Sequence, residues 1–547
     1  MKVERFASHP SEYLHWHLTV DGEIATLTMD VQEEGGNGYI RKLNSYDIFV
    51  DIELNDAVTR ILFEYPEVRS VVITSGKDRI FCSGANIPML ASSPHAFKVN
   101  FCKYTNETRN SLEDISLHGG PKFLAALNGV ASGGGYELAL ACDEAVLVDD
   151  RSSAVSLPEV PLLGVLPGTG GLTRVVDKRK VRRDIADYFS TLAEGIRGKK
   201  AVKYRLVDAT YKLSKFPKKI ADHAQNLAMQ VTPIVNSADQ GVTWDPVESS
   251  VDEEGNRSYA HVQLQLNTSR RGATITINAP DSIGPQTADD IFKAGVNWWP
   301  LAAFRQIEDA LLHLRFNHLD IGCITFLTRG SQDILMAIDE QIANNQNNWF
   351  VSRATHYIKR VLKRIDVTSK TLVALVDKKS AYAGTLFELV ALADRSFMLD
   401  DPDEEIQVKL SALNFGMYPM GNGLTRLQTR FYGEAETLKE VESRIGESLD
   451  TAVVDELNLV TFAPDDIDWD DEIRLFYEER SGFSSDGLTG MEQNLRFAGP
   501  ETMETKIFGR LSAWQNWIFI RPNAVGPQGA LKAFGSPHQP VYDFNRT

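Results

Sequence analysis

The sequence is poor in cysteine and has no long apolar run. Its four cysteines, Cys82, Cys102, Cys142 and Cys323, are scattered over 547 residues, and none forms a CxxC pair. So sparse a set builds no disulfide framework and is typical of a reducing compartment, so we expect a cytoplasmic protein. Residues 123–142, the most apolar stretch, contain Asn, Glu and several Gly and so make a poor membrane span. The N-terminal residues carry no apolar signal core, so we expect no export.

Positive charge is also in deficit. The 57 Lys and Arg residues face 74 Asp and Glu residues, which gives a net charge of −17. Such a surface repels phosphates and anionic lipids, so we expect neither a nucleic-acid nor a membrane partner. Any anionic ligand would need a local cationic pocket. The apolar (43%) and charged (24%) fractions are those of a globular protein, and the length predicts three or four structural units.

Two distant parts of the chain are similar to each other. The matching pairs are residues 123–143 with 372–394, 164–174 with 416–426, and, more weakly, 22–28 with 272–277. The offset is 251 residues between Glu137 and Glu388, 252 between Arg174 and Arg426, and 250 between Gly22 and Gly272. Collinear matches at one offset predict a tandem duplication.

Each repeat alternates short β-branched segments with longer helical ones. Residues 24–29 have the composition of a strand, and residues 47–65 have the apolar spacing of a helix. This alternation predicts an α/β fold. We expect domains at 1–235 and 261–437, a linker at 236–260 that is rich in Asp, Glu, Ser, Pro and Gly, and a helical C-terminal region at 438–547.

Two glycine-bearing segments in the first repeat have the pattern of an anion-binding backbone. They are Phe81-Cys-Ser-Gly-Ala85-Asn86 and Ala131-Ser-Gly-Gly134-Gly-Tyr-Glu137. Glycines that follow a strand and open a helix leave backbone N–H groups facing outward, where the helix dipole favours negative charge. Two such amides can hold one developing oxyanion, and each donor is typically worth about 3 kcal/mol in the transition state.

Two glutamates accompany these segments. Glu137 lies three residues beyond Gly134, which brings its carboxylate near the amide, and Glu159 stands between two prolines that stiffen its backbone. Such a pair can share acid and base roles. Each feature alone has a plainer explanation: a packing glycine, an acid at a helix start, or a solvated loop acid. The two glycine segments and the two glutamates, found together in this order, favour a functional site.

Together these motifs resemble the crotonase (enoyl-CoA hydratase/isomerase) superfamily over about the first 210 residues. The resemblance implies tandem crotonase-like (ββα spiral) domains with a helical C-terminal tail. It implies that the backbone N–H groups of Ala85 and Gly134 polarise the thioester of an acyl-CoA, and that Glu137 and Glu159 handle water and protons. Asn86 stands where the superfamily usually has Asp, which leaves the hydrogen bonding of that loop open.

The second repeat resembles a crotonase domain without its site. It keeps Gly384 and Glu388, but Ser411 replaces Glu159 at the same offset, and nothing near Leu335 is similar to the Ala85 loop. We expect this repeat to serve packing and oligomer contacts.

Three further residues follow from the resemblance. Cys102 falls on the helix that roofs the acyl pocket in crotonases; it is either a base or nucleophile toward the substrate or a small buried apolar residue. Arg79, and less clearly Arg41, occupy positions that contact CoA in crotonases.

Resemblance over the whole chain, including the tail at residues 508–526, is to a ring-opening branch of the superfamily. It implies hydrolytic cleavage of an epoxidised benzoyl-CoA with two waters, which releases formate and an aldehyde-bearing acyl-CoA. It also implies no cofactor and no metal. Because the second repeat covers surfaces that single crotonase domains bury by forming trimers, we expect a homodimer. The alternatives are an ordinary enoyl-CoA hydratase or isomerase, a biotin-dependent carboxyltransferase, and a non-catalytic binding protein. The Glu137/Glu159 pair and the lost second loop count against the carboxyltransferase, and the net negative charge counts against an RNA-binding relative.

Overall fold

The structure, a computed structural model, describes residues 2–34, 38–234 and 241–547. It divides into two compact units, Val3–Pro246 and Val247–Thr547. Residue 235, which ends the first expected domain, and residues 236–240 of the expected linker lie outside the described residues.

The rest of the expected linker does not form a free connection. Val242 is buried, and the ring of Trp244 stacks on Phe63 with 4.5 Å between centroids. Two short strands follow, β10 (Ser250–Val251) and β11 (Arg257–Ser258), and both join the sheet of the second unit. Apolar residues inside a polar segment therefore anchor this stretch to the first unit, and backbone pairing anchors it to the second.

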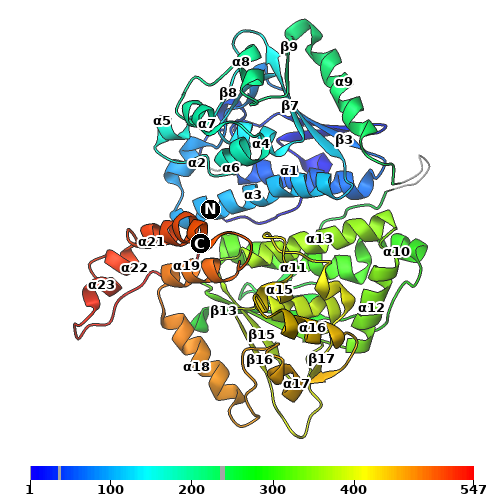
Figure 1. Ribbon diagram of the computed structural model, residues 1–547, viewed down its shortest axis with the longest axis vertical. Coiled ribbons are helices and arrows are strands. Elements are labelled where there is room, and N and C mark those ends of the chain that lie inside the picture. The colour runs from blue at the N-terminus through cyan, green and yellow to red at the C-terminus, as the bar shows by residue number, and fades with distance from the viewer. Residues whose placement is uncertain (1, 35–37, 235–240) are drawn as a thin grey trace. The chain divides into compact units, whose positions relative to one another are not determined.

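The first unit is built on a six-stranded sheet in the order β1-β2-β3-β5-β7-β9 (Figure 1). The strands are β1 (Trp16–Asp21), β2 (Ile24–Met29), β3 (Ser70–Ser75), β5 (Lys122–Leu127), β7 (Glu144–Asp149) and β9 (Ala209–Lys212). β1 and β2 form an antiparallel hairpin, and every other neighbour is parallel. Apolar residues on β3, β5 and β7 pack against α9 (Phe216–Met229), which covers one face and so creates the core.

A second, smaller sheet of this unit carries the glycine segments. Its parallel strands are β4 (Arg79–Cys82), β6 (Gly129–Ser132) and β8 (Val155–Ser156). Segment 83–86 leaves the carboxyl end of β4, and α4 (Gly134–Ala141) follows the carboxyl end of β6. Because these strands are parallel, both segments emerge at the same edge, which is where open α/β sheets bind ligands.

The remaining helices of this unit complete its fold. They are α1 (Ile48–Glu64), α2 (Ile87–Ser92), α3 (His95–Leu117), α5 (Glu159–Leu163), α6 (Gly171–Thr173), α7 (Arg183–Ser190) and α8 (Gly198–Lys203). The Asp47 carboxylate caps α1 by accepting from the N–H groups of Phe49 and Val50. α3 packs against both α1 and α4, so a long rigid helix lies beside the start of α4.

The second unit repeats the order from β1 to β7, with two more strands ahead of the hairpin. Its seven-stranded sheet runs β10-β11-β12-β13-β14-β15-β16, with an antiparallel β12–β13 hairpin followed by parallel neighbours. The main elements are β12 (Val262–Asn267), β13 (Gly272–Asn278), β14 (Cys323–Arg329), β15 (Thr371–Val376), β16 (Arg395–Met398), α10 (Ala288–Ala294), α11 (Trp299–Asn317), α12 (Gln332–Asn344), α13 (Trp349–Asp366) and α14 (Glu388–Ala391). The duplicated sequence pattern thus corresponds to the same pairing in both units.

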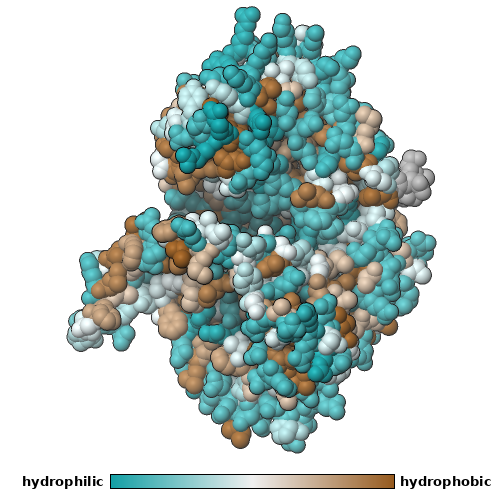
Figure 2. Space-filling view, viewed as in Figure 1, coloured by the Kyte–Doolittle hydropathy of each residue, from teal (hydrophilic) through white to brown (hydrophobic). Residues whose placement is uncertain are grey.

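From residue 438 onward the chain is mainly helical. The elements of this part are α16 (Ala435–Ser443), β18 (Leu449–Asp450), α17 (Thr451–Glu456), α18 (Trp469–Gly482), α19 (Ser485–Leu495), α20 (Met503–Lys506), α21 (Ser512–Ile518), α22 (Pro522–Val525) and α23 (Ala530–Ala533). Figure 2 shows tan and brown side chains along the segment that carries α21, α22 and α23. The chain from α20 to α23 exposes large apolar residues: Phe508, Leu511, Phe519, Ile520, Leu531 and Phe534.

Candidate active site

The segment after β4 presents one backbone amide to the site. Tyr46 pairs with the side of this segment that faces away from the site. The Tyr46 N–H donates to the Gly84 carbonyl (2.7 Å), and the Tyr46 carbonyl accepts from the Asn86 N–H (2.8 Å). Peptide groups alternate in direction along an extended chain, so the Ala85 N–H faces away from Tyr46. Among the described residues, no acceptor is bonded to the Ala85 N–H.

The start of α4 presents a second amide. Gly133, with a φ of 51°, turns the chain into the helix, and the Gly134 N–H is one of the first-turn donors that have no intrahelical acceptor. A Cβ on Gly134 would lie 3.4 Å from the Ala85 nitrogen, and one on Gly84 would lie 3.2 Å from the Gly134 nitrogen. The two amides therefore adjoin, and glycine leaves the space before them open. This arrangement can hold a thioester oxygen as negative charge develops on it.

Glu137 lies one turn further along α4 and is only 2% exposed. Its Oε1 accepts from the N–H groups of Thr169 (2.9 Å) and Gly171 (2.7 Å), and its Oε2 accepts from the Thr169 hydroxyl. A Cβ on Gly134 would lie 3.9 Å from Oε2, so the carboxylate stands beside the amide. Three donors hold it in one orientation. The sequence pattern at residues 164–174 did not identify Thr169 and Gly171 as partners of Glu137.

Glu159 opens α5 and is 9% exposed. A Cβ on Gly133 would lie 2.5 Å from the Glu159 Oε1, so this carboxyl faces the same backbone turn. Its Oε2 is buried and has no hydrogen-bond partner among the described residues. Burial, together with the charge of Glu137, raises the pKa of Glu159 to about 7. This carboxyl can therefore hold or release a proton near neutral pH.

Asn86 has a clear structural role in place of the usual Asp. Its Oδ1 caps α2 by accepting from the Met89 N–H (2.9 Å). Its side-chain NH₂ donates to the Ile40 carbonyl (2.8 Å) and the Ser45 hydroxyl (2.9 Å). A carboxylate has no N–H to donate, so the amide ties the Ala85 loop to residues 40–45 in a way that Asp could not.

Cys102 lies on α3 and is half-buried. Burial, with a smaller contribution from the charge of Glu137, raises the pKa of the thiol to about 11, although Arg109 acts in the opposite direction. At neutral pH the group is a thiol rather than a nucleophilic thiolate.

The two expected CoA-binding arginines lie in different environments. Arg79 begins β4 and its side chain is 72% exposed, with Asp78 as a distant partner at 4.0 Å. Arg41 is only 2% exposed, and its Nε donates to the Asp47 carboxylate at 2.5 Å. A guanidinium buried against a helix-capping acid is not available to phosphates at the surface, so the expectation for Arg41 was wrong.

In the second unit an internal carboxylate fills the corresponding place. The Asp339 Oδ2 accepts from the Thr385 N–H (2.7 Å) and the Ser411 hydroxyl (2.6 Å), and its Oδ1 accepts from the Thr385 hydroxyl (2.7 Å). A Cβ on Gly384 would lie 2.1 Å from Oδ2. Thr385 is the counterpart of Gly134 at the offset of 251 residues, so the amide that is open in the first unit is already bonded here.

The other features of the second unit agree with this. Glu388, the counterpart of Glu137, accepts from Arg426 (2.9 Å) and from the Asn414 amide (2.8 Å). The loop that carries Ala85 in the first unit is replaced by α12, which supplies Asp339. The groups of this unit that correspond to the site of the first unit thus all form internal hydrogen bonds.

Comparison with known proteins places the chain in a family. Residues 41–254 match the enoyl-CoA hydratase/isomerase family. The chain is 54% identical over 543 residues to the benzoyl-CoA-dihydrodiol lyase of Aromatoleum evansii, a match that covers 99% of this chain and 97% of that one. It is 35% identical over 193 residues to the fatty acid oxidation complex subunit alpha of Shewanella loihica, which covers 35% of this chain and 25% of that one.

Among solved structures, an enoyl-CoA hydratase from Bacillus anthracis matches 40% of this chain and 78% of its own, with 25% identity and a TM-score of 0.34. Within the described residues no helix is both long and apolar enough to cross a membrane. Because the identity to the lyase spans nearly the whole of both proteins, the chain belongs to the benzoyl-CoA-dihydrodiol lyase family of the crotonase superfamily.

Proposed function

We propose that the first unit binds the CoA thioester of an epoxidised benzoate and opens its ring. The observation that carries this proposal is the pair of adjoining amides, Ala85 and Gly134, flanked by two buried carboxyls, Glu137 and Glu159. The name of the full-length relative supports an aromatic acyl-CoA as the substrate.

In this proposal the thioester oxygen lies between the two amides, which stabilise the enolate-like charge that develops next to the ring. Glu159, with a pKa of about 7, takes a proton from water and returns it to a ring oxygen. Glu137, fixed by Thr169 and Gly171, orients the second water. Two waters and 2,3-epoxybenzoyl-CoA would then give 3,4-dehydroadipyl-CoA semialdehyde and formate, with no cofactor beyond the substrate's own CoA.

Two further residues belong to the proposal in limited roles. Arg79 is exposed at the start of β4, so its guanidinium can reach the phosphates of CoA. Cys102 would act in its protonated form, as an S–H donor or as part of the pocket wall, because burial disfavours its thiolate.

We also propose a cytoplasmic homodimer. The apolar residues on the segment from α20 to α23, such as Phe508, Ile520 and Phe534, are 70%, 74% and 91% exposed. Apolar patches of this kind usually mark an interface. The four free cysteines agree with a reducing compartment.

The product mixture tests the proposed reaction. Incubation with 2,3-epoxybenzoyl-CoA should release one formate per acyl-CoA consumed, and mass spectrometry should identify the six-carbon semialdehyde. Crotonyl-CoA, assayed in parallel, should be turned over far more slowly. Hydration of crotonyl-CoA without formate release would instead identify an enoyl-CoA hydratase. Tight acyl-CoA binding with no turnover of either ester would identify a binding protein.

A further inference from the structure

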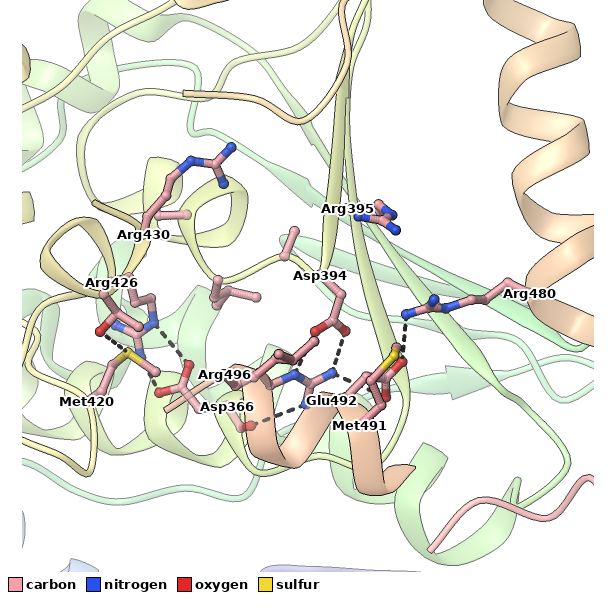
Figure 3. Close-up of a pocket in the computed structure, with 15 residues that line it drawn as sticks. Asp366, Asp394, Arg395, Met420, Arg426, Arg430, Arg480, Met491, Glu492 and Arg496 are labelled. Carbon is pink, nitrogen blue, oxygen red and sulfur yellow. Dashed lines mark hydrogen bonds and ion pairs between the residues drawn. The ribbon is translucent and has the colours of Figure 1, made fainter. Parts of the chain in front are cut away.

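A cavity of about 290 Å³ in the second unit concentrates positive charge. Five arginines line it: Arg395, Arg426, Arg430, Arg480 and Arg496 (Figure 3). The chain as a whole carries a net charge of −17, so this cluster runs against its overall composition.

Three of these arginines are neutralised by acids. The ion pairs are Arg426 with Asp366 (2.7 Å), Arg496 with Asp394 (2.5 Å) and Arg480 with Glu492 (3.1 Å). Dashed lines in Figure 3 mark these contacts along the lower side of the cavity. They build a rigid wall whose charges largely cancel.

The other two arginines lack such partners. The Arg430 Nε donates to the Asn458 carbonyl (2.8 Å), and Arg395 lies over the ring of Phe462 at 5.9 Å. Neither forms an ion pair with an acid in the described part of the chain. Arg430 is half-buried, and burial without a counterion lowers the pKa of its guanidinium to about 10, which leaves it positively charged at neutral pH.

We propose that this cavity binds an organic carboxylate through Arg395 and Arg430. A guanidinium pairs well with a carboxylate because its N–H groups match the two oxygens. The rest of the lining includes Leu392, Met420, Met491 and Leu495. This apolar wall suits a hydrocarbon stem and gives no advantage to an inorganic anion.

Calorimetry on the full chain with hexanoate tests this inference, with inorganic phosphate and chloride at equal ionic strength as comparison arms. Hexanoate should bind more tightly than phosphate, and Arg430→Gln and Arg395→Gln should each weaken binding at least tenfold. Arg474→Gln, which removes a surface ion pair with Glu478, serves as the matched control and should leave binding unchanged. Phosphate binding without hexanoate binding, or equal hexanoate binding in all variants, would overturn the inference.

An independent observation concerns a buried cation behind the two amides of the first unit. Tyr46 brackets Ala85 through its backbone, and the guanidinium of Arg109 lies over the Tyr46 ring at 5.2 Å. Arg109 also donates from Nη2 to the Gly134 carbonyl (2.9 Å). One side chain therefore links the elements that carry the two amides.

Arg109 is itself held in place. Its Nη1 donates to the Thr105 carbonyl (3.2 Å) and lies 3.9 Å from the Asp51 Oδ1. Asp51 accepts in turn from the hydroxyls of Tyr46 and Thr108. Arg109, Asp51 and Tyr46 are all fully buried, so this cluster has little freedom to rearrange.

We infer that Arg109 is a positioning residue that fixes the spacing of the Ala85 and Gly134 amides. The inference rests on the proposed function, because it matters only if those amides hold a thioester. A misplacement of about 1 Å in such a site costs on the order of 100-fold in rate.

Infrared spectra of bound benzoyl-CoA with a ¹³C-labelled thioester carbonyl test this role beside kinetics. Arg109→Met should lower kcat about 100-fold with KM changed less than about threefold, and the bound carbonyl band should move back toward its free position. Arg109→Lys should recover part of both. Tyr46→Phe, which keeps the backbone bonds around Ala85, should show a smaller loss of the same kind.

The outcomes separate the two claims. No band shift in the unsubstituted protein would contradict the proposed function itself. A normal shift there, with full kcat or an unchanged carbonyl band in a folded Arg109 variant, would overturn only the positioning role.

Discussion

Replacing Glu159 by Gln should stabilise the protein at alkaline pH and abolish its turnover. The Glu159 carboxyl is 9% exposed, lacks a partner for its Oε2, and has a pKa raised from 4.5 to about 7. A pKa that is higher in the folded state means that the folded protein resists ionisation. The free-energy cost that ionised Glu159 imposes on the folded state is absent well below pH 4.5, grows as the pH rises, and is complete above pH 7.

The size of this effect follows from the two pKa values. Each pKa unit corresponds to about 1.4 kcal/mol, so ionised Glu159 costs the folded state about 3 kcal/mol at pH 8 and less than about 1 kcal/mol at pH 5. Glutamine carries no charge at either pH. The gain in stability from Glu159→Gln should therefore appear at pH 8 and nearly vanish at pH 5. Any effect of the substitution on packing would be the same at both pH values.

Thermal unfolding of the first unit at the two pH values measures this difference. For a unit of this size, about 3 kcal/mol corresponds to a gain in Tm of roughly 6–12 °C at pH 8. Glu194→Gln makes the same chemical change at an exposed position and should give no pH-dependent gain. An equal Tm change for Glu159→Gln at pH 5 and pH 8 would refute the reasoning, as would near-normal turnover of the variant.

Three further predictions follow from the geometry of the two units. Gly133→Ala places a Cβ 2.5 Å from the Glu159 Oε1 at a φ of 51°. The carboxyl must therefore move, and kcat should fall about 100-fold. As the control, Gly272→Ala adds a Cβ with nothing within 4 Å and should leave kcat unchanged. Asp339→Ala leaves the buried N–H of Thr385 and the hydroxyl of Ser411 without their acceptor and should lower the stability of the second unit by about 1–3 kcal/mol in a denaturant titration; unchanged stability would show that the carboxylate is not needed there. Cys102→Ser should keep the pH–rate midpoint near 7, because the thiol, with a pKa of about 11, does not titrate there; a shifted midpoint would identify Cys102 as the titrating group.

The duplication and the site motifs could be predicted from sequence because they depend on local patterns. Glycines before a helix expose amides wherever they occur, and an acid three residues later falls beside them. The structure brings Ala85, Gly134, Glu137 and Glu159 together as those patterns indicated. Their catalytic roles stay predictions.

Features that depend on distant partners could not be predicted in this way. Arg41 is buried because Asp47, the cap of α1, neutralises it, and a charged residue on its own indicates a surface position. Thr169 and Gly171 reach Glu137 only through the fold. The carboxylate of Asp339 lies on a helix that replaces a loop, so the lost motif gave no sign of what took its place.

The central claim is that a thioester oxygen binds between two backbone amides of the first unit. A crystal structure of the protein with benzoyl-CoA tests it most directly. We expect the carbonyl oxygen within about 3 Å of both the Ala85 and Gly134 nitrogens, with the aromatic ring beside Glu137 and Glu159. A thioester bound in the second unit, or one whose oxygen contacts neither nitrogen, would contradict the account.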